Sequence, residues 1–217
     1  FREKIKKKFN LNMIVRSNDI AIRKNINPFS ENIDDYTHIM KTVPLIEAID
    51  DLKFDIAFGG ARRDEEKSRA KEKIFSVRTN HKWEPKKQRP EFWSHFNVLH
   101  DKDETIRVFP LSNWKELDIW LYIAKENISI PNLYFSKKRP TIVRKNQILM
   151  VDDKRLKIEK NEKIENRFIR FRTLGCYPLT SAIESKAVNV KEIIKELMLS
   201  NKSEREGRLI DHANEGG

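Results

Sequence analysis

A short apolar segment that runs into two glycines and a cluster of charged side chains limits how this chain can fold more than any other feature. Phe54 to Phe58 is apolar apart from Asp55, which predicts a buried strand. Gly59 and Gly60 follow at a point where the backbone must turn sharply or let a ligand approach closely. In open α/β sheets ligands bind at the carboxyl ends of strands, so the sequence predicts an anion-binding loop here. The alternative is a glycine turn that leads into an ordinary solvated helix.

The residues directly after the glycines carry many charges of both signs. The cations among them are Arg62, Arg63, Lys67 and Arg69. Arginine suits an oxyanion because its planar fork donates two parallel hydrogen bonds, so Arg62 and Arg63 are the first candidates for contacting an anion. The other two cations are second choices. Asp64 or Glu65 could orient an arginine or hold magnesium, although an acid at a helix N-terminus also stabilises the helix dipole.

The segments around this loop predict an α/β protein. Residues 11–15 are apolar enough for a strand, and residues 36–52 carry apolar side chains near helical spacing. Pro44 lies inside that helical segment and indicates that a helix begins there. The succession of strand, helix and strand is typical of a parallel sheet with right-handed connections.

The second half of the chain predicts a different mixture of elements. A capping pair of Asn113 and Glu116 begins a helix with one apolar face. The expected elements are a helix over residues 113–125, a hairpin of residues 141–144 and 148–151, a strand over residues 168–173 and a helix over residues 190–199. We therefore expect two domains, residues 1–125 and residues 126–217.

Charge and cysteine content narrow the classes of function. The net charge of +11 suggests nucleic-acid binding, but the lysines are scattered and alternate with glutamates, as in residues 154–166. That pattern is typical of a solvated surface. The chain has one cysteine, Cys176, no signal-peptide pattern and no apolar run of membrane-spanning length. We expect a cytoplasmic protein that does not bind membranes or nucleic acid.

Five long motifs resemble one family. They are residues 59–76 (GGARRDEEKSRAKEKIFS), 107–123 (RVFPLSNWKELDIWLYI), 150–153 (MVDD), 170–185 (RFRTLGCYPLTSAIES) and 203–212 (SEREGRLIDH). In this order they resemble the small subunit of bacterial heterodimeric sulfate adenylyltransferase. The resemblance implies a Rossmann-like adenine nucleotide α-hydrolase domain over residues 1–125, with a mixed C-terminal extension over residues 126–217.

The reaction that this resemblance implies joins sulfate to the adenylyl group of ATP and releases pyrophosphate. Both reactants are anions, so such a site needs preorganised cations and backbone N–H groups more than an acid–base pair. ATP with Mg²⁺ would be the nucleotide substrate, and no tightly bound cofactor is expected. The family also implies a GTP-hydrolysing large subunit as the partner.

A second arginine-rich segment could form another anion-binding edge. In an alternating strand Arg170 and Arg172 share one face, and the strand runs on to Gly175. The alternative is an edge strand whose polar face lies in water. Cys176 is interpreted as a small packing residue, because the implied reaction requires no thiol.

Two further segments carry weaker expectations. The helix that contains Asp118 is mostly a core helix, and a buried Asp118 would need a partner such as an arginine of the anion site. The C-terminal tail matches the family, so we expect Arg205 and Arg208 to fold over the site or contact the partner subunit. The histidines show no spacing typical of metal ligands, and no metal site is predicted.

One family motif has no counterpart in this sequence. The family binds ATP phosphates through a Ser-Gly-Gly-Lys-Asp-Ser-like loop, and the chain aligns beyond it, so the 217 residues alone are expected to be inactive. Three alternatives remain open. They are a phosphoadenylyl-sulfate reductase, which would need a cysteine in its tail, a non-catalytic scaffold for the GTPase subunit, and an RNA-binding or RNA-modifying protein.

Overall fold

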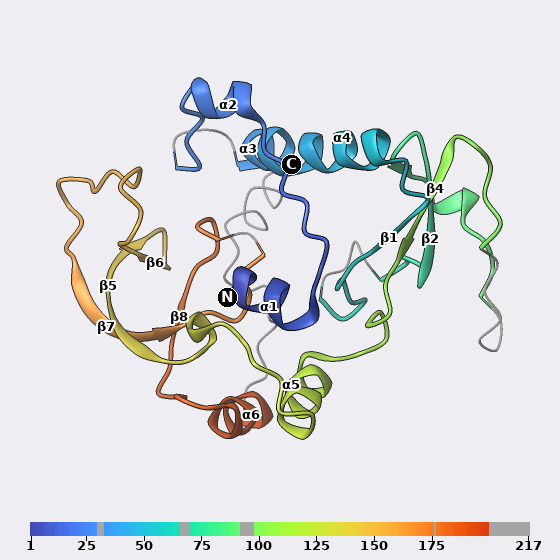
Figure 1. Ribbon diagram of the computed structural model, residues 1–217. Coiled ribbons are helices and arrows are strands. Elements are labelled where there is room, and N and C mark those ends of the chain that lie inside the picture. The colour runs from blue at the N-terminus through green and yellow to red at the C-terminus, as the bar shows by residue number, and fades with distance from the viewer. Residues whose placement is uncertain (30–32, 66–69, 92–97, 176, 200–217) are drawn as a thin grey trace. The chain divides into compact units, whose positions relative to one another are not determined.

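The computed structural model describes residues 1–29, 33–65, 70–91, 98–175 and 177–199 (Figure 1). The chain divides into a terminal unit, Phe1–Pro44 with Trp120–Gly217, and a central unit, Leu45–Ile119. This division differs from the expected boundary after residue 125. The N-terminal residues belong with the C-terminal part, as shown by the hydrogen bond from Asn27 Nδ2 to the Arg155 carbonyl at 3.3 Å. No helix within the described ranges is long and apolar enough to cross a bilayer.

The central unit is built on a mixed four-stranded sheet of order β1-β4-β2-β3. Its strands are β1 (Ile56–Phe58), β2 (Phe75–Thr79), β3 (Lys82–Trp83) and β4 (Glu104–Val108), with a short 3₁₀ turn, η3 (Pro85–Lys87). Only β1 and β4 pair in parallel, whereas β2 is antiparallel to both of its neighbours. The expected α/β class is confirmed in outline. The sequence predicted a parallel sheet, whereas in this sheet the parallel pairing is limited to β1 and β4. The most buried apolar residues of the strands in this sheet are Val77, Ile106 and Val108.

The predicted helix before β1 begins earlier than Pro44. Helical residues form three pieces, α3 (Ile33–Thr37), a π-helical turn η1 (His38–Thr42) and α4 (Val43–Leu52). Proline lacks an N–H and its ring crowds the carbonyl one turn back, so the turn before Pro44 is wound wider and the N–H of Val43 bonds to the His38 carbonyl. The strand expected over residues 11–15 is wrong, since these residues are mostly exposed and form neither helix nor strand.

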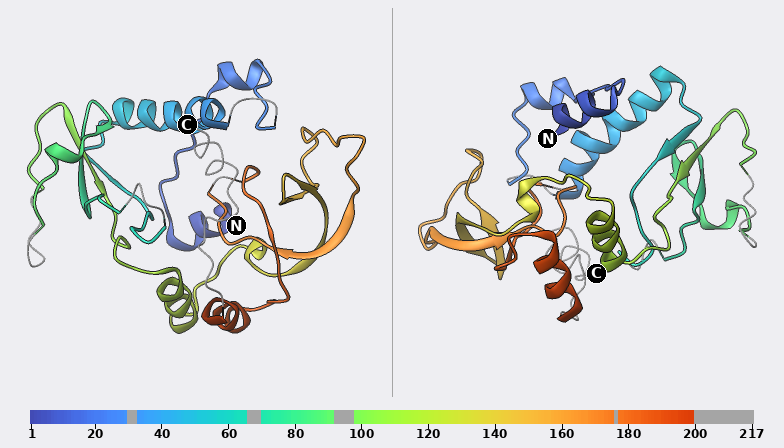
Figure 2. Two further views of the ribbon diagram at one scale, coloured as in Figure 1. Left: turned by 180° about the vertical axis from the view of Figure 1, so that it is seen from behind. Right: turned by 60° about the horizontal axis from the view of Figure 1, so that its bottom comes forward.

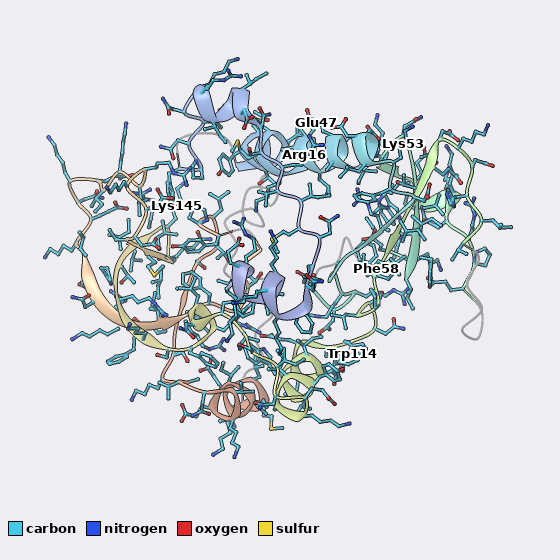
Figure 3. The ribbon with its side chains drawn as sticks, in the orientation of Figure 1. Arg16, Glu47, Lys53, Phe58, Trp114 and Lys145 are labelled. Atoms are coloured by element: carbon cyan, nitrogen blue, oxygen red, sulfur yellow. The ribbon has the colours of Figure 1, made fainter. Side chains whose placement is uncertain are left out.

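The terminal unit contains an antiparallel sheet of order β6-β5-β7-β8. Besides α3 and η1, its elements are α1 (Arg2–Phe9), α2 (Asp19–Arg23), most of α5 (Glu116–Lys125), η4 (Asn132–Tyr134), β5 (Lys137–Arg144), β6 (Gln147–Met150), β7 (Glu165–Arg170), β8 (Ile183–Glu184) and α6 (Val190–Leu199). The predicted hairpin is confirmed as β5 and β6. Its two-residue turn places Lys145 and Asn146 at φ of 48° and 61°, the left-handed pair that a type I′ turn requires (Figure 3).

Helices α5 and α6 lie side by side, and their facing apolar side chains form one core of the terminal unit (Figures 1 and 2). Trp120 and Ile193 are its buried centre, at 4% and 0% exposed. The predicted helix over residues 190–199 is confirmed at both ends. Asn189 fixes its start, because its side-chain oxygen accepts from the Glu192 N–H at 3.0 Å and its amide donates to the Glu192 carboxylate at 2.8 Å.

A bidentate ion pair next to the hairpin makes the stability of the terminal unit depend on pH. Arg144 Nε and Nη2 donate to the two carboxylate oxygens of Glu162 at 2.7 and 2.8 Å. The Arg144 hydrogen bonds are the main cause that lowers the Glu162 pKa from 4.5 to about 2. A lowered pKa in the folded state stabilises the fold above the unfolded pKa, and this contribution is lost as the pH falls from 4.5 toward 2.

We therefore expect Glu162→Gln to unfold more easily than the parent protein at about pH 7 and equally easily once Glu162 is protonated in both states. Denaturant titrations at several pH values measure the difference. The same gap between the two proteins at neutral and at strongly acidic pH would contradict this role of Glu162.

Candidate functional site

The loop that follows β1 begins at the carboxyl end of the parallel pair of β1 and β4. The Gly59 N–H donates to the Val108 carbonyl of β4 at 2.9 Å. A Cβ at Gly59 would lie 2.8 Å from Cε1 of Phe109, so this glycine is required by close packing against the Phe109 ring. Gly60 has open space where a side chain would stand. Phe58, the last residue of β1 and labelled in Figure 3, is 75% exposed, whereas the sequence predicted a buried strand.

Arg63 joins this loop to three other segments of the central unit. Its Nε donates to the Glu72 carbonyl at 2.9 Å, and its Nη1 donates to Asn113 Oδ1 at 2.7 Å. Its Nη2 forms an ion pair with Glu91 Oε2 at 3.0 Å. The backbone N–H of Arg63 also bonds to the Ser112 carbonyl at 2.9 Å. The loops after β1 and β4 are thus held together, and protein acceptors already take three of the guanidinium donors.

Two side chains that the sequence analysis did not select cover the part of the β2 edge that the two-residue strand β3 leaves unpaired. The Gln88 amide accepts from the Val77 N–H at 2.9 Å and donates to the Val77 carbonyl at 3.0 Å, as a neighbouring strand would. One oxygen of Glu91 accepts from the backbone N–H groups of Ile74 and Phe75 while the other holds Arg63. No local pattern marks this role, because an amide and a carboxylate three residues apart read as ordinary surface residues.

The other described residues of the loop have different environments. Arg62 is 9% exposed, and its backbone N–H lies 3.4 Å from Glu65 Oε2 while the Glu65 N–H donates to the Arg62 carbonyl. These two contacts close a tight turn, which is a local role for Glu65. Asp64 is exposed. Arg62 and Arg63 therefore differ, since Arg62 is nearly enclosed while Arg63 spans several segments.

A second basic cluster lies on one face of the same sheet. Strand register pairs Ser76 with Arg107 and Arg78 with Thr105, so these four side chains share a face. Arg78 Nη1 donates to Ser76 Oγ at 2.9 Å, and Arg78 Nη2 pairs with the Glu72 carboxylate. The pKa of Arg107 lies below its ordinary value, because burial disfavours the charge and Arg78 repels it. Neither arginine was selected from the sequence, although the alternation Ser-x-Arg and Thr-x-Arg places them on one face.

Arg170, the last residue of β7, does not lie at an exposed anion-binding edge as expected. Arg170 is 0% exposed, and its Nε and Nη2 both donate to Glu196 Oε1 of α6, at 3.1 and 2.6 Å. The second Glu196 oxygen accepts from Ser185 Oγ. Arg170 therefore has a structural role, since it ties the strand to a helix and has no exposed donor for an anion.

The neighbours of Arg170 do not form the predicted strand face. Strand β7 ends at Arg170, Phe171 is 0% exposed, and Arg172 is partly buried beyond the strand. The Gly175 carbonyl accepts from Lys41 Nζ at 2.9 Å. These residues belong to the terminal unit, and the Gly59–Glu65 loop belongs to the central unit.

Asp118 is exposed, in contrast to the buried carboxylate that was considered. Its Oδ2 accepts from the Lys115 N–H at 2.8 Å, which caps the first turn of α5. Asn113, predicted as the cap, instead accepts from Arg63. The remaining predicted site residues, Lys67, Arg69, Arg205 and Arg208, lie outside the described residues, as does Cys176.

Comparison with known proteins bears on what this arrangement is for. The sequence pattern of the phosphoadenosine phosphosulfate reductase domain matches residues 1–182. Proteins named sulfate adenylyltransferase subunit 2 from Mesorhizobium japonicum and Aliivibrio fischeri are each 54% identical over all 217 residues, which cover 72% of their length. The protein of that name from Brucella ovis is 52% identical over the same span. Because this identity extends over all 217 residues, the chain belongs to the sulfate adenylyltransferase subunit 2 family.

Proposed function

We propose that this chain is the catalytic small subunit of a sulfate adenylyltransferase, which converts ATP and sulfate to adenylyl sulfate and pyrophosphate. The observation that carries the proposal is the 54% identity to proteins of that name over the whole chain. The geometry agrees with it, since Arg63 pins a cation-bearing loop beside the carboxyl ends of two parallel strands. That edge is where α/β sheets bind anionic ligands.

The proposed reaction breaks one bond and forms another at phosphorus. A sulfate oxygen attacks the α-phosphorus of ATP, and the bond to the bridging oxygen of the β-phosphate breaks as pyrophosphate leaves. Negative charge grows on the leaving group, so fixed cations and N–H donors stabilise the transition state. Arg62 and Arg63 are proposed to supply this charge, with Gly59 and Gly60 shaping the loop. Lys67 and Arg69 are the second choices.

ATP is expected to enter as its magnesium complex, and no tightly bound cofactor is proposed. Asp64 or Glu65 could contact the metal ion or orient an arginine. In the terminal unit, Arg172 and Gly175 remain candidates for contacting an anion, and Arg205 and Arg208 for closing over the site or contacting the partner. The reaction is proposed to take place in the cytoplasm.

A partner subunit is part of the proposal. The relatives are named as one numbered subunit, which implies at least one other subunit in their assemblies. Forming an anhydride between sulfate and phosphate is strongly uphill, so the reaction needs a second source of free energy. We propose that a GTP-hydrolysing large subunit supplies it.

Sulfate-dependent exchange of pyrophosphate into ATP, measured with the full-length encoded chain and its partner subunit, tests the proposal. We expect exchange only when sulfate is present. Arg62→Ala should lower kcat/KM about ten- to a hundredfold, the equivalent of one or more charge-assisted hydrogen bonds. Lys82→Ala, which removes an exposed cation from β3, is the control and should leave exchange unchanged.

Three other results would contradict parts of this proposal. Exchange without sulfate, or ATP binding without exchange, would contradict the sulfate assignment and favour another nucleotide chemistry. Absence of ATP binding would favour a scaffold role for the GTPase subunit. Equal activity of Arg62→Ala and Lys82→Ala would remove Arg62 from the site.

A further inference from the structure

Arg107 has an environment that an arginine rarely occupies without a partner. It lies on the central strand β4, partly buried, between Ala57 of β1 and Ser76 of β2 in the strand register. Among the described residues its guanidinium donates no hydrogen bond and forms no ion pair. Charged groups that leave water are normally paired, because an unpaired charge in a region of low dielectric is costly.

The groups around Arg107 increase this cost. Arg78, its diagonal neighbour on β2, carries the same charge, and Glu72 is the one acid that acts on Arg107. That acid already accepts from Arg78 and from Ser76 Oγ. Thr105 on the same face has a buried hydroxyl with no hydrogen-bond partner in the described part of the chain. The face thus holds two cations, one acid that is already engaged, and unused donors.

We propose that Arg107, with Arg78 beside it, forms a subsite for a tetrahedral oxyanion, either sulfate or a phosphate group of the nucleotide. The five N–H donors of Arg107 suit bidentate binding of two oxygens, and an anion would relieve the repulsion between the two arginines. Arg78 is held in place by Ser76 and Glu72, so it is a fixed part of the subsite. The identity of the anion as sulfate or nucleotide phosphate rests on the proposed function. The existence of an oxyanion subsite at Arg107 does not.

Two variants and a control test the subsite. Arg107→Gln removes the charge and the fork, and Arg107→Lys keeps only the charge. The matched control is Arg89→Gln, which also removes a cation from the central unit. Arg89 is paired, since its Nη2 donates to Glu104 at 2.9 Å. Because the Arg107 guanidinium has no hydrogen-bond or ion-pair partner among the described residues, Arg107→Gln should fold and melt at the same temperature as the parent or higher when no oxyanion is added.

The first readout is thermal stability with inorganic sulfate or pyrophosphate added, which requires no catalysis. We expect at least one of the two anions to bind the folded state and thereby raise the melting temperature of the parent and of Arg89→Gln. The melting temperature of Arg107→Gln should not change. Equal shifts in all three proteins would overturn the subsite. So would a large loss of stability of both Arg107 variants without anion, because Arg107 would then be a structural residue.

The second readout is the exchange reaction of the complex with its partner subunit. A rise of about tenfold or more in the sulfate KM of Arg107→Gln, with ATP and pyrophosphate unaffected, assigns the subsite to sulfate. The reverse pattern assigns it to the nucleotide phosphates, and Arg107→Lys should be intermediate in either case. Unchanged KM values for all three substrates would overturn the proposal. If the parent shows no sulfate-dependent exchange, the proposed function fails and the thermal readout still decides the subsite.

Discussion

Replacing Arg170 with methionine should lower the free energy of unfolding by about 3 to 5 kcal/mol, the largest stability loss that we expect from a single charged residue in this chain. Arg170 is 0% exposed and bonds twice to Glu196 of α6. The substitution leaves the Glu196 carboxylate partly buried, with the Ser185 hydroxyl as its one remaining partner among the described residues. Denaturant unfolding followed by circular dichroism measures the change.

A matched control lies on the same strand. Arg167 of β7 forms ion pairs with Glu165 and Glu184, but its side chain is 31% exposed. Solvent screens such pairs, so Arg167→Met should cost much less stability than Arg170→Met. The double variant Arg170→Met with Glu196→Leu should recover much of the loss, because it removes both charges and keeps the volume.

The two roles considered for Arg170 give opposite results. If Arg170→Met were no less stable than Arg167→Met and sulfate-dependent exchange nevertheless collapsed, Arg170 would be a site residue, as the sequence suggested. Loss of stability with exchange preserved below the melting temperature would confirm the structural role.

The prediction for Arg170 also shows why sequence patterns identified its strand but not its function. Alternation indicates which residues share a face of a strand, yet it does not say which face is enclosed. The enclosing group is Glu196, 26 residues away on a helix that was itself predicted with the correct ends. Elements fixed by local chemistry could be predicted, such as the hairpin that turns at Lys145 and Asn146 and the helix that begins after Asn189.

For the loop after β1, the sequence likewise predicted the local elements but not their contacts with distant residues. A strand and two glycines were sufficient to predict a turn at the carboxyl end of β1, and the family resemblance was confirmed. The requirement of Gly59 for close approach to Phe109 could not be predicted, since the two residues are 50 positions apart. The acceptors of Arg63 were missed for the same reason, because Glu91 and Asn113 are neighbours only in the fold.

Glu91 carries the second large expected effect. Glu91→Ala should lower the rate of sulfate-dependent exchange at saturating substrate about a hundredfold, because a loop displaced by about 1 Å no longer aligns the reacting groups. The substitution removes the acceptor of two backbone N–H groups at the start of β2 and the ion-pair partner of Arg63. We also expect it to lower the free energy of unfolding by about 2 to 4 kcal/mol.

The control for Glu91 is Glu104, another carboxylate with little exposure, at 10% against 14% for the Glu91 side chain. Glu104 pairs with Arg89, which belongs to the same segment as Glu91, but it does not contact the Gly59–Glu65 loop in any of the hydrogen bonds described. Glu104→Gln should therefore cost stability without a comparable loss of exchange. Glu91→Gln keeps an oxygen for the backbone N–H groups and loses the charge that holds Arg63, so it should fold better than Glu91→Ala.

Comparison of the two Glu91 variants separates folding from positioning. If the ion pair with Arg63 positions the loop, Glu91→Gln recovers most of the stability that Glu91→Ala loses but little of the exchange rate. Arg63→Lys should then show the same kinetic loss, because lysine cannot span Glu72, Asn113 and Glu91 together. If Glu91 acts only by sealing the edge of β2, Glu91→Gln recovers the rate and the stability together. Parallel recovery would leave Arg63 as an anion-binding candidate through its remaining donors and would remove Glu91 from the catalytic argument.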